Sequence, residues 1–300
     1  MSSTPLPRAA PPSITSSGLL FLAITSVSWG LNFPVMKIIL REWPPLTSRG
    51  LAGLVGAALL ALIAIAMKQD LRVPRHFWLR LIGISLLTVT CWVSLMGLAL
   101  LWLPASEAAV IAISVPVWVS IMAWPILGER ISLMRAAALA VALGGIMFLI
   151  GGKGIDVSLE KMPGIALGVA AAILVAGGTI ALKRFPLAMP PVSLSAWQIG
   201  LGSIPVALAG LVFERPPLSA LSATGWASMA YLIVVQFCVA YVCWFAALAR
   251  LAASTAAIGT LMVPVIGVLA SALILYEPLG LRELVVLALT IGGVAVAMRS

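Results

Sequence analysis

Two charged side chains lie inside long apolar stretches of the sequence, and they have the clearest capacity for chemistry. Arg49 falls about one helical turn into the second stretch, and Glu107 falls about as deep in the fourth. A charge among apolar groups is costly unless it faces a partner or a cavity. We hypothesise that the two side chains pair across a gate, or bind the carboxylate and the amine of a zwitterion. Snorkelling of both to lipid headgroups is the alternative.

A second group of side chains is polar or aromatic and also lies deep within apolar stretches. Its members are Trp29, Asn32, Phe33, Thr90, Trp92, Trp118, Trp197, Gln198, Gln236, Tyr241 and Trp244. Apolar walls with a few polar groups are typical of a small-molecule pocket. Polar side chains should face the interior of a helix bundle, so Asn32, Gln198 and Gln236 are better candidates than any tryptophan, for which helix packing is the alternative. We predict that this group, with Arg49 and Glu107, binds substrate.

The sequence offers no set of residues for catalysis or metal binding. It holds no Ser-His-Asp set, no Cys-His cluster, no phosphate-binding Gly-rich loop and no pair of acids within apolar stretches. His76 is the sole histidine, and Cys91, Cys238 and Cys243 fall in apolar stretches, where packing is their expected role. We predict that the protein is not an enzyme and uses no cofactor and no metal.

The elements that position these residues are expected to be membrane-spanning helices. The chain has 300 residues, of which 62% are hydrophobic and 9% charged, and its mean hydropathy is +1.18. Apolar runs of about twenty residues must be helical, because lipid cannot satisfy free backbone groups. The sequence predicts an all-α membrane protein with ten spans, at residues 18–39, 45–67, 80–103, 105–127, 133–151, 163–184, 190–213, 224–247, 252–275 and 282–298.

The charge distribution between the spans predicts the orientation of the chain. With ten spans both termini share one side, and the loops on that side carry most of the lysines and arginines, whereas the opposite loops carry most of the acids. By the positive-inside rule, both termini are cytoplasmic, and residues 1–17 form a disordered tail. The net charge of +9 therefore reports topology and indicates no nucleic-acid partner. Four tryptophans near span ends are expected to anchor the protein at the lipid interface: Trp43, Trp78, Trp102 and Trp226.

The chain contains an internal repeat. Residues 103–145 align with residues 251–293, so that the Val-Pro-Val at 115–117 meets the Val-Pro-Val at 263–265 and Glu129 meets Glu277. Five spans are an odd number, so the second half, 163–298, is predicted to be inverted relative to the first, 18–151. Inverted repeats favour alternating access around a site near the membrane midplane. Glu129 and Glu277 each precede a predicted helix, and we expect their carboxylates to cap free amides there.

The order and spacing of several residues resemble the EamA-type transporters of the drug/metabolite transporter superfamily. The resemblance covers nearly the whole chain, and it rests on Trp29-Gly30 with Asn32-Phe33, Arg49, Pro116 with Glu129, Gly144-Gly145, Pro264 with Glu277, and Gly292-Gly293. It implies a ten-helix exporter or exchanger of amino acids, related metabolites, nucleotide-linked sugars or toxic cations in a bacterial inner membrane. The second half departs from the first, with Gly177-Gly178 in place of Trp29-Gly30 and Trp197 or Ser195 in place of Arg49.

These observations predict a membrane transporter that exports small metabolites, with amino acids as the foremost substrates and membrane lipid as its surroundings. Proton-coupled efflux of drugs or toxic organic cations is the alternative within the same class. A channel or a structural membrane subunit is the alternative from another class. Channels usually build a pore from several subunits, whereas this chain carries its own two-fold repeat, so we expect it to function as a monomer.

Overall fold

The computed structural model describes residues 15–112, 114–128, 160–215, 221–248, 250–251, 259–260, 262–281, 284–285 and 288. Within these ranges every regular element is helical. Seven helical stretches are long and apolar enough to cross a membrane: Ser16–Ile39, Pro45–Ala66, Arg75–Ala99, Ala105–Leu127, Met162–Arg184, Pro191–Glu214 and Ala223–Leu248. A shorter apolar helix, α13, covers Met262–Leu275. The predicted spans 133–151 and 282–298 lie outside the described residues, apart from residues 284, 285 and 288.

Two of the spans contain π-helical segments at corresponding positions. The stretch Arg75–Ala99 consists of the short turn η1 (Arg75–Phe77), α3 (Trp78–Ser85), η2 (Leu86–Thr90) and α4 (Cys91–Ala99). The stretch Ala223–Leu248 consists of α10 (Ala223–Ala230), η5 (Tyr231–Val239) and α11 (Ala240–Leu248). The 148-residue offset of the sequence repeat places η2 inside η5. π-helical segments inside α-helices often mark functional sites.

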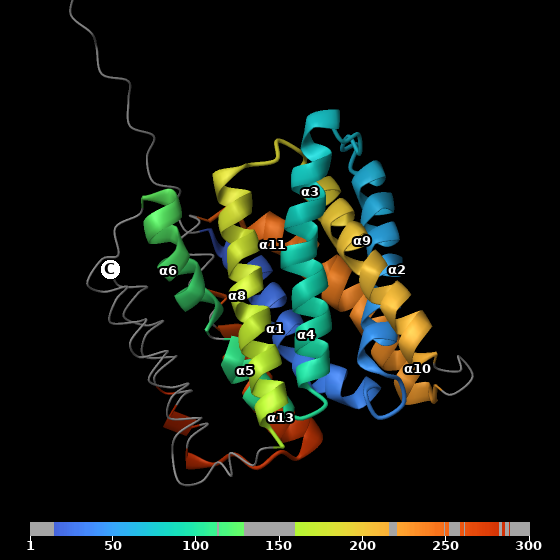
Figure 1. Cartoon of the computed structure of the whole chain (residues 1–300), viewed down its shortest axis with the longest axis vertical. Coiled ribbons are helices and arrows are strands. Elements are labelled where there is room, and N and C mark those ends of the chain that lie inside the picture. The colour runs from blue at the N-terminus through green and yellow to red at the C-terminus, as the bar shows by residue number, and fades with distance from the viewer. Residues whose placement is uncertain are drawn as a thin grey trace, which may run out of the picture.

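The fourth span is broken near its middle. Helix α5 covers Ala105–Ala112, and α6 covers Val115–Leu127. Pro116 has no amide hydrogen to continue the helix, and the Ser114 amide instead donates to Ile111 in a tighter turn. The break re-aims α6 relative to α5, as Figure 1 shows.

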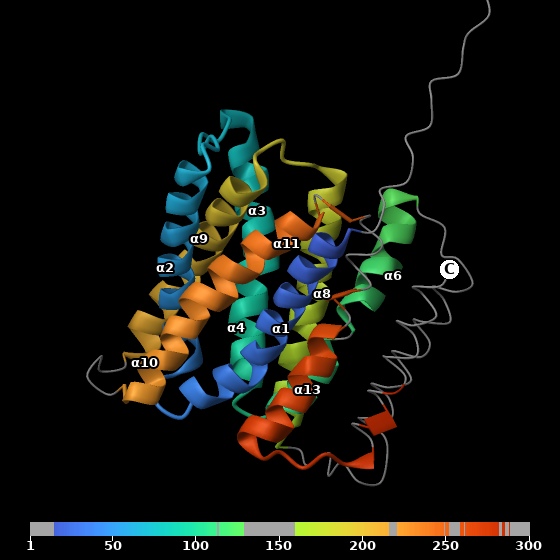
Figure 2. The same ribbon diagram turned by 180° about the vertical axis from the view of Figure 1, so that it is seen from behind.

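The helices pack in a pattern of exchanged partners. Helix α1 (Ser16–Ile39) packs against α11 and α13, whereas α8 (Met162–Arg184) packs against α4 and α6. Helix α2 (Pro45–Ala66) forms the most extensive contact of the described residues with α9 (Pro191–Ala209), and Figures 1 and 2 show the two side by side. A two-fold axis that exchanges the two halves of the sequence repeat would generate this pattern.

Glycines bring α2 and α9 into backbone contact. A Cβ at Gly50 would overlap the backbone of Ala207, and a Cβ at Gly210, where α9 continues as η3 (Gly210–Glu214), would overlap the backbone of Thr47. A Cβ at Gly53 would overlap Ser203. Membrane helices are held together by close van der Waals packing, since lipid provides no hydrophobic force between them. Small residues such as these glycines allow that close approach.

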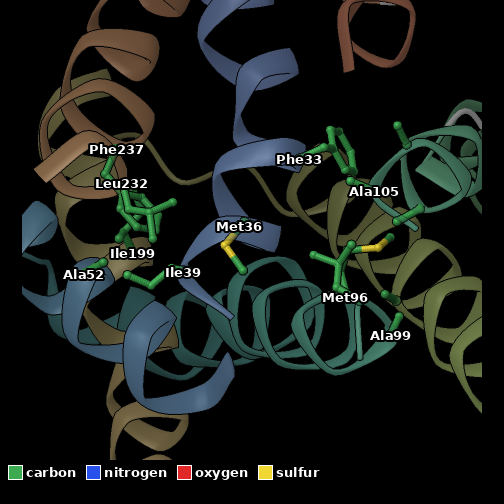
Figure 3. Close-up of a cluster of buried hydrophobic side chains, with 14 of the residues drawn as sticks. Phe33, Met36, Ile39, Ala52, Met96, Ala99, Ala105, Ile199, Leu232 and Phe237 are labelled. Carbon is green, nitrogen blue, oxygen red and sulfur yellow. The ribbon is translucent and has the colours of Figure 1, made fainter. Parts of the chain in front are cut away.

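The largest buried cluster surrounds the second half of α1. Figure 3 shows Ile39 beside Ile199 of α9 and Leu232 of η5, and Phe33 beside Ala105 of α5. Met36 and Ile39 are fully buried between these groups. Helix α1 therefore lies at the centre of the bundle and contacts elements of both halves.

Tyr276 is expected to be a strained position whose replacement by glycine stabilises the protein. Its φ is 56°, in the left-handed region, and Gly128 occupies the corresponding position of the first half with a φ of 69°. The side chain of Tyr276 is 89% exposed and makes little packing contact. Removing its Cβ should relieve about 1 kcal/mol of strain, and Tyr276→Gly should raise the melting temperature in detergent. Leu279→Gly, at an ordinary φ in the same loop, is the control; a lower melting temperature for Tyr276→Gly would contradict the prediction.

Candidate functional site

Four of the predicted binding residues carry a buried polar atom without a hydrogen-bond partner in the described part of the chain. The atoms are Asn32 Oδ1 on α1, Trp118 Nε1 on α6, Gln198 Nε2 on α9 and Gln236 Oε1 on η5. Buried polar atoms are nearly always satisfied in native proteins, since leaving one unpaired costs about 1–3 kcal/mol. Two of the four are acceptors and two are donors. A polar ligand that both accepts and donates hydrogen bonds would satisfy such groups.

Arg49 is buried inside the bundle. Its side chain is 6% exposed and lies along Gly97 of α4, where an added Cβ would come within 2.9 Å of Arg49 Cδ. Among the described residues it forms no hydrogen bond and no ion pair. The guanidinium is thus a positive charge without a counter-ion among the described residues.

The predicted direct pairing of Arg49 with Glu107 is wrong in this structure. Glu107 Oε1 instead accepts a hydrogen bond from Lys161 Nζ at 2.7 Å, directly before α8. The physical reason is placement: Glu107 lies on α5, which packs against α1, α8 and α13, whereas Arg49 lies on α2 against α4. Glu107 therefore joins the two halves through Lys161.

An aromatic cluster joins α1 to α11. The ring of Trp29 lies 5.5 Å from that of Tyr241 in an edge-on arrangement and 5.7 Å from that of Trp244. Directly before Trp29, the carbonyl of Ser28 accepts a hydrogen bond from the Tyr231 hydroxyl of η5 at 2.6 Å. The structure thus brings together three of the predicted aromatic residues, and it adds Tyr231, which the sequence argument missed.

The remaining predicted residues occupy separate places. Phe33 belongs to the central core, and Trp92 is partly buried between that core and a small valine cluster. Thr90 Oγ1 donates to the Gly202 carbonyl of α9 at 2.6 Å. Trp197 Nε1 donates to the Leu71 carbonyl at 2.8 Å, and its ring packs edge-on against Trp78. Trp197 therefore lies at one end of the bundle rather than deep within it.

Trp197 also lines a groove of about 250 Å³ between α2 and α9. Its other walls include Leu54, Ala57, Ala61 and Ile204. Such an apolar groove contains none of the unpaired polar atoms and offers nothing to fix the orientation of a polar substrate.

Three carboxylates gather at one end of the bundle, which we call the carboxylate end. Each belongs to one half and caps a helix of the other: Glu214 accepts from the amides of Leu46 and Thr47 at 3.1 and 2.7 Å, Glu277 from those of Ala105 and Ser106 at 2.8 and 2.9 Å, and Glu42 from that of Ser222 at 2.6 Å. The hydroxyls of Thr47, Ser106 and Ser222 donate to the same carboxylates. These contacts tie the halves together, because the first amides of a helix have no partner within it.

Glu277 caps a helix, as predicted, but a different helix from the one that the sequence indicated. The sequence suggested that it caps the helix that follows it, whereas it caps α5, which lies far away in the chain. Glu129, its counterpart, lies outside the described residues. At the opposite end of the bundle, Gln69 Oε1 accepts from the Ser193 amide at 3.2 Å. The residue Gln69 after α2 therefore holds the start of α9, and Glu214 after α9 holds the start of α2.

Hydrogen bonds at the carboxylate end also affect titration. The side chain and then the backbone of Ser222 lower the pKa of Glu42 from its ordinary value. A lowered pKa means that the contact is complete above the ordinary pKa and is lost as the pH falls through the folded-state value. Within the first half, Lys37 of α1 donates to the Leu100 and Leu103 carbonyls after the end of α4.

Seven helical stretches long and apolar enough to cross a bilayer indicate a multi-pass membrane protein. The model of the EamA-like transporter family matches the chain twice, over residues 16–151 and 162–299. The chain therefore belongs to the EamA-like transporter family, and it is a membrane transporter.

Several known proteins are similar along nearly their whole length. A protein of Escherichia coli (strain K12) named "Probable amino-acid metabolite efflux pump" is 29% identical over 87% of this chain and 88% of its own length. "Uncharacterized transporter YvbV" of Bacillus subtilis (strain 168) is 27% identical over 88% of this chain and 86% of its own length. A solved crystal structure shares the fold with a TM-score of 0.71 at 22% identity, covering 95% of this chain and 97% of that one.

Proposed function

We propose that this protein exports small metabolites, amino acids foremost, by alternating access around a central cavity. In this proposal ten helices form two inverted halves, residues 18–151 and 163–298, behind a disordered tail of residues 1–17. The protein works as a monomer in the bacterial inner membrane with both termini cytoplasmic. The carboxylate end then faces outward, in keeping with the basic residues of the opposite loops.

The exchanged packing of α1 and α8 carries the mechanism. Each first span packs against the third and fourth spans of the other half. Under a two-fold axis in the membrane plane, two such arrangements of similar energy exist, one open to each side. Cross-half contacts such as Glu277 with Ser106 and Lys161 with Glu107 are those that a closed carboxylate end would require.

The substrate class rests on polarity and on similarity. Asn32, Trp118, Gln198 and Gln236 offer both acceptors and donors, as a zwitterion requires. The similar Escherichia coli and Salmonella typhimurium proteins carry names that refer to amino-acid metabolite efflux. We extend that substrate class to this chain.

Export from preloaded liposomes tests the proposal. Purified protein is reconstituted, and the release of labelled amino acids, amines and sugars is followed with and without an imposed proton gradient. Selective release of amino acids at carrier rates is the expected result. Release of cationic amines driven only by the gradient would favour proton-coupled efflux, and conductance in a planar bilayer above carrier turnover would indicate a channel; either result would contradict the proposal.

A further inference from the structure

Within the part of the chain that the structure describes, Arg49 has no counter-ion, although acids lie at the same end of the bundle. Four described acids at this end form hydrogen bonds with residues other than Arg49: Glu42 with Ser222, Glu107 with Lys161, Glu214 with Thr47 and Glu277 with Ser106. Glu160 is exposed to solvent. The charge of Arg49 is therefore not neutralised by these side chains.

The position of Arg49 makes the missing partner significant. A guanidinium does not lose its proton in proteins, so burial cannot be relieved by neutralisation. A buried charge without a partner is strongly unfavourable. Arg49 also lies near the start of α2, where the helix dipole disfavours a positive charge. The carbonyl end of α4 lies nearby and would attract a cation, but Lys37 already binds the Leu100 carbonyl there.

The surroundings of Arg49 are built to hold it inside the bundle. Gly97 leaves room for the side chain, because a Cβ there would come within 2.9 Å of Arg49 Cδ. Gly53 lies one turn after Arg49 on α2, and Ser203 of α9 faces it. Ser203 Oγ is also buried without a hydrogen-bond partner among the described residues. When Pro45 is aligned with Pro191, the position of Arg49 corresponds to Ser195 in the second half. The second half therefore has no arginine at this position.

We propose that Arg49 binds the anionic group of the transported molecule, a carboxylate, and so restricts the substrates to carboxylate-bearing metabolites. This inference rests on the proposed function and narrows it. The planar guanidinium fits a carboxylate through two parallel hydrogen bonds, which gives direction as well as charge. Organic cations without an anionic group would leave the buried charge unpaired and are excluded.

Matched pairs of ligands test this inference in two separate assays. In each pair an amino acid is compared with its amide, which keeps the amine and side chain but lacks the carboxylate. The first assay measures the shift in melting temperature of the purified protein in detergent. The second measures export from liposomes. We expect the amino acids to stabilise the protein and to be exported at least about tenfold better than their amides, the lower end for a charge-assisted hydrogen bond.

Variants assign the discrimination to Arg49. Arg49→Gln should abolish the preference for the carboxylate in both assays, and Arg49→Lys should keep part of it, since a lysine retains charge without the planar fork. Gly97→Ala should weaken the preference by displacing the side chain. Arg41→Gln, which removes an exposed arginine at the same end, is the matched control and should leave the preference unchanged.

The outcomes separate this inference from the proposed function. Export of amino acids and amides at equal rates, with no effect of Arg49→Gln, would overturn the carboxylate site and leave the exporter standing. Carboxylate-specific stabilisation that depends on Arg49, without any export, would support the site and contradict the exporter. If Arg49→Gln does not fold, the Arg49→Lys and Gly97→Ala variants decide: a full carboxylate preference in both would overturn the inference.

Discussion

Gly50→Val is expected to prevent the accumulation of folded protein. A side chain at this position would overlap the backbone nitrogen and Cα of Ala207, which cannot move aside as the end of a flexible side chain can. Ordinary overpacking costs about 1–3 kcal/mol. Displacing a backbone in the central helix pair should cost more, a large part of a total stability of about 5–15 kcal/mol.

Size-exclusion chromatography of detergent extracts, with the melting temperature of any folded fraction, measures this effect. Gly83→Val is the matched control, because Gly83 also lies within a span but no atom lies within 4 Å of an added Cβ. We expect the control to behave like the original protein. A monodisperse Gly50→Val protein with an unchanged melting temperature would show that α2 and α9 are not held at backbone contact.

The clamps at both ends of α2 and α9 explain why this pair cannot adjust. Glu214 holds the start of α2, and Gln69 holds the start of α9. Opening a path between these two helices would break one clamp and the glycine contacts together. Under the alternating access that we propose, α2 and α9 are therefore expected to stay fixed relative to each other while the helices around them move.

The positions of the spans were predictable because the bilayer imposes their length. Apolar runs bounded by charges and prolines predicted all seven long spans to within a few residues, and the largest shift is in the third, predicted at 80–103 and observed at Arg75–Ala99. The π-helical segments were not predicted. Segment η5 is apolar apart from Tyr231 and Gln236, and its composition does not distinguish a π turn from an α turn.

The cross-half caps were missed because the partners lie far apart in the chain. Residues Glu214 and Thr47 are 167 apart, Glu277 and Ser106 are 171 apart, and Gln69 and Ser193 are 124 apart. A local pattern nevertheless marks three of the four capped helices, α2, α5 and α9. Each of these three begins with proline, any residue and then serine or threonine, at 45–47, 104–106 and 191–193, whereas α10 has no proline at its start. The pattern identifies the helix start that needs a partner, but only the fold determines which carboxylate or amide supplies it.

The prediction of an interfacial position was wrong for one tryptophan, Trp43. Trp43 was expected at the lipid interface, but it is 2% exposed and belongs to the central core. Trp102 and Trp226, expected at the interface as well, are 41% and 53% exposed. Distance from a span end therefore predicts depth along the membrane normal, but it does not predict whether a side chain faces lipid or protein.

Glu277→Gln is expected to open the carboxylate end of the protein. The Glu277 carboxylate accepts three hydrogen bonds from the start of α5, from two amides and the Ser106 hydroxyl. An amide side chain of the same size loses the charge and points its NH₂ group at donors. Hydrogen bonds to a charged group contribute about 1.5–3 kcal/mol. Losing that amount should shift the ratio of closed to open states roughly tenfold or more.

A single cysteine at Leu103, which is fully buried beside this contact, reports the opening. In a background without the three natural cysteines, the labelling rate of Leu103→Cys by a membrane-impermeant maleimide should rise about tenfold when Glu277→Gln is added. Glu160→Gln is the matched control, because it removes the same charge from an exposed residue at the same end. An unchanged labelling rate together with a lower melting temperature would mean that Glu277 supports the fold without gating it, and the movement would then have to be sought at Lys161 and Glu107.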